Sequence, residues 1–429
     1  MISKRLVCSI MLMVSFIAIL SGCNNQKASG QDKEVVEIEY WHVNNQDWGG
    51  ETIKELVKQF NEEHPEIVVT EKFQPGNYTG LLQNAQAGIS AKNPPDVAQI
   101  GYNFIQYVEE NVPYTPIEKL ESEYDSGFIK EQFENNIAAL GQGADGVQAG
   151  LPYALSNPIL YYNADLLKEA GFNPDEAPKT WDDVKKISAA VKEKTGAYGL
   201  YVQEPPDNWA QYALVKSNGG NWMKENGQVD VDSSEAAEAY DMLGELAKKE
   251  EALHITWEEG IQAFTSGKVA MMMTTIGRRG NIESESKFDL RGASIPTFGN
   301  KERQVAAGGN ALFVFSQDKK KQEAAWEFIK FLESEQALTK WVKATGYLPP
   351  VKGVAESETG LKSFFEGNPL MQIAIGQMND IVPWFNFPGT NGLQAEQALL
   401  DARDQVMSGK KSGEDALKEA AEKIKKLIQ

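Results

Sequence analysis

Cysteine and histidine are scarce in this chain of 429 residues, which contains two cysteines and three histidines. Two cysteines exclude a scaffold held together by several disulfides. No histidine lies close in sequence to another histidine or to a cysteine, so no dense zinc-ligand spacing is present. The nucleophile motif Gly-x-Ser-x-Gly and the phosphate-loop motif Gly-x-x-x-x-Gly-Lys-Ser/Thr are absent as well. We therefore expect no metal, no cofactor and no catalytic activity.

Positive charge is also in deficit, because 42 Lys and Arg residues face 61 Asp and Glu residues and the formal net charge is −19. A protein that binds nucleic acid needs a basic face to meet the phosphates, so we expect no nucleic-acid partner. Hydrophobic residues make up 41% of the chain, which is enough for a folded globular protein. At roughly 100–200 residues per domain, the length predicts two domains.

The N-terminus has the pattern of an export signal. Lys4 and Arg5 precede an uncharged apolar run at residues 6–20, which as a helix of about 22 Å is too short for the roughly 30 Å hydrocarbon core of a membrane. The tetrapeptide Leu-Ser-Gly-Cys that ends at Cys23 resembles the lipobox of bacterial lipoproteins. It implies a signal peptide at 1–22, a lipidated Cys23 that carries palmitate-like chains, and a polar tether at 23–33. The alternative is an ordinary secretory signal in which Cys23 is incidental.

The rest of the chain alternates between strand and helix patterns. Apolar residues repeat at every second position in residues 35–42, and at i, i+3, i+4 and i+7 in residues 51–63. Further predicted strands lie at 67–73, 96–100, 150–163 (interrupted by Pro158), 268–275, 288–296 and 310–315. Further predicted helices lie at 78–89, 181–195, 234–249, 256–264, 320–333 and 416–428. This order is typical of an α/β fold with open sheets.

Several segments resemble the extracellular solute-binding proteins of carbohydrate ABC importers. They are Ser-Asn-Pro-Ile-Leu-Tyr-Tyr-Asn at 156–163, Pro-Lys-Thr-Trp-Asp-Asp at 178–183, Gly-Lys-Val-Ala-Met at 267–271, the glycine pair at 308–309 and Thr-Gly-Tyr-Leu-Pro at 345–349. The segment Gly-Asn-Tyr at 76–78, together with Gly309 and Tyr347, is most similar to the subgroup that binds glycerol 3-phosphate or sugars.

The resemblance implies an α/β, two-lobed, periplasmic-binding-protein-like (type II) fold. It predicts discontinuous lobes joined by hinge strands, an N-lobe at 34–154 and 306–346, and a C-lobe at 155–305 and 347–429. A solute, here a saccharide, would lie in the cleft and be delivered unchanged to ABC permease subunits. The protein would be a monomer, and its lipid would hold it on the outer face of the cytoplasmic membrane. The alternatives are a receptor for an anionic sugar or polyol phosphate, and a secreted carbohydrate-active enzyme.

Sugars present apolar faces that suit aromatic rings and hydroxyls that suit polar side chains. The loop after the first strand contains His42 and Asn44, although asparagine also forms turns. Tyr78 matches a ligand-contacting tyrosine of the subgroup. Tyr102 or Asn103 stands where the subgroup has a ligand-contacting acid, so either residue would replace it.

Other candidates lie further along the chain. Asn157 aligns close to a serine with which the subgroup contacts its solute. Its alternative role is a hinge hydrogen bond alone. Trp209 and Trp222 would stack on the solute or pack in the C-lobe core, and Trp384 would stack on it. Three candidates remain. Arg278 would bind an anion, Gly309 would let the backbone approach the solute closely, and Tyr347 would contribute a ring or a hydroxyl. The phosphate-anchoring arginine of the subgroup is missing from residues 389–395, which favours a saccharide over a phosphate.

Overall fold

A computed structural model describes residues 35–204, 207–224, 226–385 and 387–428. Residues 35–429 form one compact unit. The predicted signal peptide at 1–22, the lipidation site Cys23 and the tether at 23–33 lie outside the described residues. Among the residues that are described, no helix combines the length and the apolar character that crossing a membrane requires.

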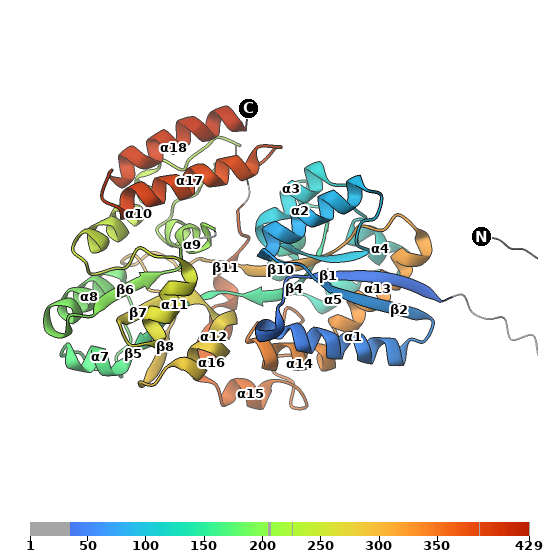
Figure 1. The fold of residues 1–429 in the computed structure, drawn as a ribbon, viewed down its shortest axis with the longest axis horizontal. Helices are drawn as coiled ribbons and strands as arrows, with labels where there is room; N and C mark the ends of the chain where they lie inside the picture. Colours follow the sequence, from blue (N-terminus) through green and yellow to red (C-terminus); the bar gives the residue numbers. More distant parts are fainter. Residues whose placement is uncertain (1–34, 205–206, 225, 386, 429) are drawn as a thin grey trace, which may run out of the picture. The chain divides into compact units, whose positions relative to one another are not determined.

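Two open sheets form the framework of the body (Figure 1). The five-stranded sheet has the order β2-β1-β3-β10-β4, the four-stranded sheet has the order β6-β7-β5-β8, and β11 pairs with β9. The strands are β1 (Val36–His42), β2 (Ile67–Phe73), β3 (Val97–Gly101), β4 (Leu151–Ser156), β5 (Pro158–Asn163), β6 (Tyr198–Val202), β7 (Val269–Thr275), β8 (Leu290–Ala293), β9 (Val305–Ala306), β10 (Gly308–Val314) and β11 (Ile381–Val382). Parallel and antiparallel pairs occur in both of the larger sheets.

Helices pack around both sheets. The helices are α1 (Glu51–Glu63), α2 (Asn77–Ser90), α3 (Ile105–Asn111), α4 (Ile117–Tyr124), α5 (Phe128–Gln132), α6 (Asn135–Ala138), α7 (Ala164–Glu169), α8 (Trp181–Thr195), α9 (Trp209–Ser217), α10 (Ser234–Lys248), α11 (Trp257–Thr265), α12 (Arg279–Glu285), α13 (Lys319–Leu332), α14 (Glu335–Thr345), α15 (Lys362–Glu366), α16 (Pro369–Gly376), α17 (Gly392–Met407) and α18 (Gly413–Leu427). We call the five-stranded sheet with α1–α6, α13 and α14 the N-lobe, and the four-stranded sheet with α7–α12 and α15–α18 the C-lobe (Figure 1).

Local sequence explains where the helices begin and which faces they bury. Helix α1 buries the apolar stripe of Ile53, Leu56, Val57 and Phe60, as its 3–4 residue spacing predicts. Helix α8 has the predicted bounds 181–195 and begins with a capping box, in which the Thr180 hydroxyl accepts from the Asp183 backbone N–H. These elements therefore follow directly from periodicity and capping chemistry.

The chain crosses between the lobes at single residues. Asn157 separates β4 of the N-lobe from β5 of the C-lobe, and Ala307 separates β9 from β10. Pro158 was predicted to interrupt one long strand, but it begins β5, and the break falls one residue earlier. Proline fits there because the first residue of a strand tolerates the missing N–H.

A third crossing follows α14. Leu348 forms a β-bridge with Leu155, and Val351 forms one with Phe133, so the chain beyond residue 346 remains attached to the N-lobe for several residues. The lobe boundaries 34–154 with 306–346, and 155–305 with 347–429, stay predictions.

The sequence contains a Gly-x-Gly-x-x-Gly match at residues 141–146. It lies in a loop between short helical turns and β4, where Gly143 and Gly146 close a tight turn. The dinucleotide-binding motif needs a strand before it and a helix after it, so this match is a turn and not a nucleotide site.

Candidate functional site

A cavity of about 360 Å³ lies between the lobes and is lined by both of them. This volume falls in the range of about 300–1,000 Å³ that is usual for small-molecule sites. Its lining side chains are mainly aromatic and polar: Trp48, Asn77, Tyr78, Thr79, Gln83, Asn103, Phe104, Ser156, Gln203, Asp207, Trp209, Trp257, Thr275, Gly308, Gly309, Tyr347, Trp384, Leu393, Glu396, Gln397 and Leu400. None of these described lining residues is a lysine or an arginine.

A column of stacked rings supports the N-lobe side of the cavity. Trp48 stacks on Tyr347 with 5.9 Å between ring centroids, Tyr347 stacks on Trp341 at 5.7 Å, and Trp341 stacks on Tyr153 at 5.2 Å. Trp341 and Tyr153 are fully buried. Because the inner two rings are fixed in the core, the outer two are held in place at the cavity wall.

A second aromatic group forms the C-lobe side. The rings of Trp209 and Trp384 lie 6.5 Å apart, centroid to centroid, and Trp209 Nε1 donates to the Ala306 carbonyl at 3.1 Å. Behind them, the buried Trp222 contacts Phe385 and stacks on Phe387. Trp222 therefore supports the segment that presents Trp384 and does not face the cavity itself.

Glycine is required where β10 begins beside the cavity. Gly309 has φ +114°, and a Cβ built on it would lie 1.8 Å from the Ala154 carbonyl oxygen. A Cβ on Gly308 would lie 2.6 Å from the Ser156 hydroxyl oxygen. The pair thus lets β10 lie against β4 at the point where the chain leaves the C-lobe.

Two carboxyl groups face the cavity from the C-lobe. Asp207 precedes α9 and accepts from the Trp209 backbone N–H at 3.1 Å, and Glu396 of α17 accepts from Asn208 Nδ2 at 3.1 Å. Burial raises the pKa of Asp207 to about 6 and that of Glu396 to about 7. Both groups therefore exchange protons within the neutral range.

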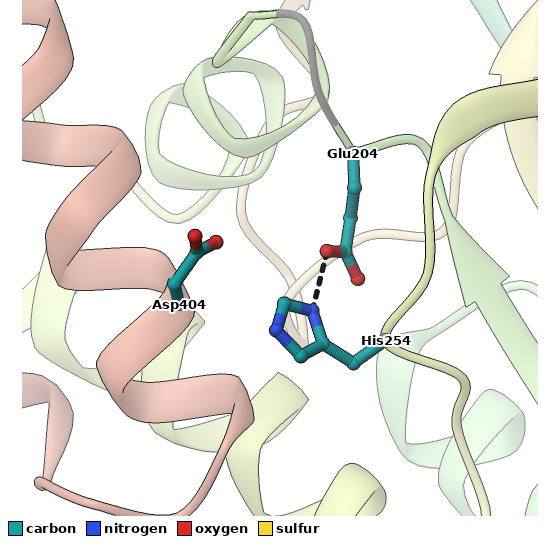
Figure 2. A group of neighbouring side chains, drawn as sticks. All are labelled: Glu204, His254 and Asp404. Atoms are coloured by element: carbon teal, nitrogen blue, oxygen red, sulfur yellow. Dashed lines mark hydrogen bonds and ion pairs between the residues drawn. The ribbon is translucent and has the colours of Figure 1, made fainter.

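A network of four charged side chains lies behind these carboxyls (Figure 2 shows three of them). His254 Nδ1 is 2.6 Å from Glu204 Oε2, and this hydrogen bond raises the pKa of His254. Arg403, only 1% exposed, donates to Asp404 at 3.0 Å and lies 3.9 Å from Glu204 Oε2. Burial raises the pKa of Glu204.

This network bears on metal binding. Glu204, His254 and Asp404 each place a possible ligand atom within 4.8 Å of the others, so by distance they could hold a divalent ion. Arg403 already supplies a positive charge to both carboxylates. The group is therefore balanced as two ion pairs, Glu204 with His254 and Asp404 with Arg403.

Six of the residues singled out from the sequence line the cavity: Tyr78, Asn103, Trp209, Gly309, Tyr347 and Trp384. The Tyr78 hydroxyl also accepts from Asn310 Nδ2 at 3.0 Å, which connects α2 to β10. Gly309 was expected to let the backbone approach the solute closely. In the structure its positive φ and the approach of the Ala154 carbonyl require glycine independently of any solute.

Three others lie within the N-lobe or the hinge and do not line the cavity. His42 is buried at the end of β1 with Nε2 2.8 Å from Glu71, and burial lowers its pKa. Tyr102 is buried beside Asn103. Asn157 donates to the Ala374 carbonyl at 2.8 Å, which is the hinge hydrogen bond weighed as its alternative.

The remaining three also lie outside the lining. Asn44 donates to the Trp48 carbonyl at 2.9 Å and so shapes the loop that presents that ring. Trp222 is fully buried, as its core alternative required. Arg278 donates to Glu258 at 2.7 Å, and its neighbour Arg279 donates to Glu283. Both arginines therefore have acidic partners, and neither lines the cavity, so the anion site at Arg278 stays a prediction.

Arg278 instead joins the lobes. Its guanidinium carbon lies 5.2 Å from the centroid of Trp48 and 4.6 Å from that of Trp257. Trp48 Nε1 also donates to the Gly277 carbonyl at 3.2 Å. Because Trp48 follows β1 and Trp257 begins α11, one cation bridges both lobes through cation–π contacts.

Sequence reasoning missed several lining residues, notably Trp48, Trp257, Asp207 and Glu396. Trp48 stands in the loop after the first strand, but His42 and Asn44 were the residues singled out there. Asp207 and Glu396 are separated by almost 190 residues, and only folding brings them to one wall. No local pattern could have paired them.

Stability should depend on pH through the two cavity carboxyls. Because folding raises both pKa values above those of the unfolded chain, this contribution is complete below about pH 4 and is lost as pH rises through about 6 and 7. From pH 5 to pH 8 we expect the free energy of unfolding to fall more in the natural chain than in D207N/E396Q, by about 4 kcal/mol. Urea unfolding at several pH values tests this, and equal pH slopes would contradict it.

Comparisons with known proteins agree with this architecture. A family model described as "Bacterial extracellular solute-binding protein" matches residues 55–371. A Shigella flexneri serotype 5b protein named sn-glycerol-3-phosphate-binding periplasmic protein UgpB is 27% identical over 422 residues, which cover 93% of this chain and 94% of that protein. A Rhizobium meliloti protein of the same name is 28% identical over 419 residues, covering 92% and 94%.

Solved structures are similar over nearly the whole chain. UgpB from Mycobacterium tuberculosis in complex with glycerophosphocholine superposes with a TM-score of 0.81 at 16% identity, covering 91% of this chain and 98% of that chain. A cyclic alpha-maltosyl-1,6-maltose binding protein from Arthrobacter globiformis gives 0.79 at 20% identity, covering 92% and 99%. At these identities the likeness concerns the fold, and it confirms the predicted two-lobed α/β type.

Proposed function

The chain belongs to the bacterial extracellular solute-binding proteins, and from that premise we propose that it captures a sugar or oligosaccharide for an ABC importer. The observation that carries the proposal is the cavity between the lobes, into which Trp48, Tyr347, Trp209 and Trp384 bring aromatic rings from both sides. Aromatic faces suit the apolar faces of sugar rings, while the lining amides and carboxyls suit hydroxyls. The N-lobe and the C-lobe would close on the solute because only the closed state lets both contact it.

A polyol phosphate or acidic sugar is the second candidate, since curated relatives are named for glycerol 3-phosphate. A site that binds a phosphate needs a cationic side chain or several N–H donors. The described lining has no lysine or arginine, and Arg278 and Arg279 are paired with glutamates. The chemistry of the cavity therefore favours an uncharged or cationic solute over an anion.

We further propose that the solute leaves unchanged, because members of the family bind solutes and deliver them. A lipid on Cys23 would hold the monomer at the outer face of the cytoplasmic membrane, within reach of the permease subunits. Palmitate labelling of the natural chain and of C23A tests the anchor. Label that persists in C23A would contradict it.

A thermal-shift screen tests the proposed substrate class. We expect neutral saccharides to raise the melting temperature, since a ligand at 100 times its Kd adds about 2.7 kcal/mol of stability. Glycerol 3-phosphate and uronates should give no shift. A shift with the anions alone would replace the saccharide by the second candidate, and chromatographic detection of shortened glycans would indicate an enzyme.

A further inference from the structure

The cavity wall of the C-lobe has more negative than positive charge. Four carboxyl groups lie in or directly behind it, on Glu204, Asp207, Glu396 and Asp404. The positive groups behind these carboxyls, among the described residues, are His254 and Arg403, whereas Arg278 lies against the lining ring of Trp257 and is paired with Glu258. Two carboxylates therefore remain without a dedicated counter-charge when all four are ionised.

The pairing identifies which two these are. Glu204 accepts from His254 (Figure 2), and Asp404 accepts from Arg403. Among the residues that the structure describes, the donors to Asp207 and Glu396 are neutral, namely the Trp209 backbone N–H and Asn208 Nδ2. Arg403 reaches Asp207 only at its backbone carbonyl, at 3.4 Å. The unbalanced charge thus lies on the two carboxyls that face the cavity.

Aromatic rings adjoin the same carboxyls. Trp209 begins α9 two residues after Asp207, and Trp384 lies against Trp209. A cation between carboxylates and indole faces gains both Coulombic and cation–π attraction, and both increase where water is excluded. Hydroxyl donors would satisfy the oxygen lone pairs but would leave the negative charge unbalanced.

We propose that the solute is a saccharide with a free amino group, and that the Asp207 and Glu396 carboxylates hold its ammonium beside the Trp209 and Trp384 rings. This inference rests on the proposed function, because it specifies the solute of the same cavity. The raised pKa values of the two acids agree with it, since a bound cation would lower them by stabilising the carboxylates.

The experiment uses sugars that share one skeleton and differ in one group. Glucose is compared with glucosamine, and cellobiose with both the dimer of β1,4-linked glucosamine and its N-acetylated form; choline is added as a cation without a sugar. Thermal shift and calorimetric titration at pH 7.5 are run on the natural chain, on D207N/E396Q and on D401N. Asp401 is an exposed carboxylate of α17 that does not line the cavity and lies 3.2 Å from Lys423, so D401N is the matched control.

We expect at least one amine sugar to bind about tenfold or more tightly than its hydroxyl and N-acetyl partners. D207N/E396Q should remove this preference and remain folded, because both changes keep side-chain size and relieve the burial of charge. D401N should retain the preference.

Four outcomes would overturn the inference. Equal or tighter binding of the neutral partners would do so and leave the proposed function intact. Amine preference that persists in D207N/E396Q would remove the two carboxyls from the site. A shift with choline and with no sugar would keep the cationic group but reject the saccharide, and no shift with any amine probe would reject the inference outright.

Discussion

Replacing Gly309 by alanine should lower the free energy of unfolding by about 3 kcal/mol or more. The new Cβ would lie 1.8 Å from the Ala154 carbonyl oxygen, in a backbone conformation with φ +114° that L-residues rarely adopt. Relief would require β10 to move away from β4, and these strands form one end of the five-stranded sheet. Urea unfolding followed by far-UV circular dichroism measures the loss.

The matched control for this substitution is Gly376→Ala. Gly376 ends α16, has no atom within 4 Å of a built Cβ and shows no positive φ. Alanine there should change stability by no more than about 1 kcal/mol. A G309A protein as stable as G376A would show that β10 does not need glycine, and the close approach of β10 to β4 would then be wrong.

The second large effect concerns solute affinity. Trp209→Ala should weaken binding of the sugar identified by thermal shift about 100-fold or more, because large aromatic residues at the centre of a site commonly account for 2–4 kcal/mol. The ring lines the cavity, and its Nε1 fixes its orientation through the Ala306 carbonyl. Calorimetric titration gives the change in Kd.

Two variants separate stacking from folding. Trp209→Phe keeps an aromatic face but loses the Nε1 hydrogen bond, so we expect a loss of about tenfold. Trp181→Phe alters a buried tryptophan at the start of α8 that does not line the cavity, so stability should fall while Kd stays within about twofold. Unchanged affinity in W209A would remove Trp209 from the site.

Much of the fold could be predicted because its signals are local. The helices predicted at 51–63 and 181–195 have the bounds of α1 and α8, and Thr180 and Asp183 form the capping box at which α8 begins. Trp181, Trp326 and Trp341 lie in amphipathic helices, and all three are buried as such a position predicts. Periodicity and capping act within a few residues, so a single sequence reveals them.

The site was predicted only in part because it depends on contacts between distant segments. Arg278 follows a buried strand and was an attractive anion ligand, but Glu258 and two indole rings already surround it. Trp209 and Trp222 had the same sequence signal, yet only Trp209 lines the cavity and Trp222 packs against Phe385 and Phe387 behind it. Which ring faces a cavity is decided by tertiary packing, and neither residue type nor local spacing contains that information.

A crystal structure of the chain with its saccharide would test most directly whether the solute is held between the lobes. We predict electron density for an intact sugar in the cavity, with Trp48 and Tyr347 on one side and Trp209 and Trp384 on the other. Density for the sugar at any other surface, or for a cleaved glycan beside Asp207 and Glu396, would contradict the proposal.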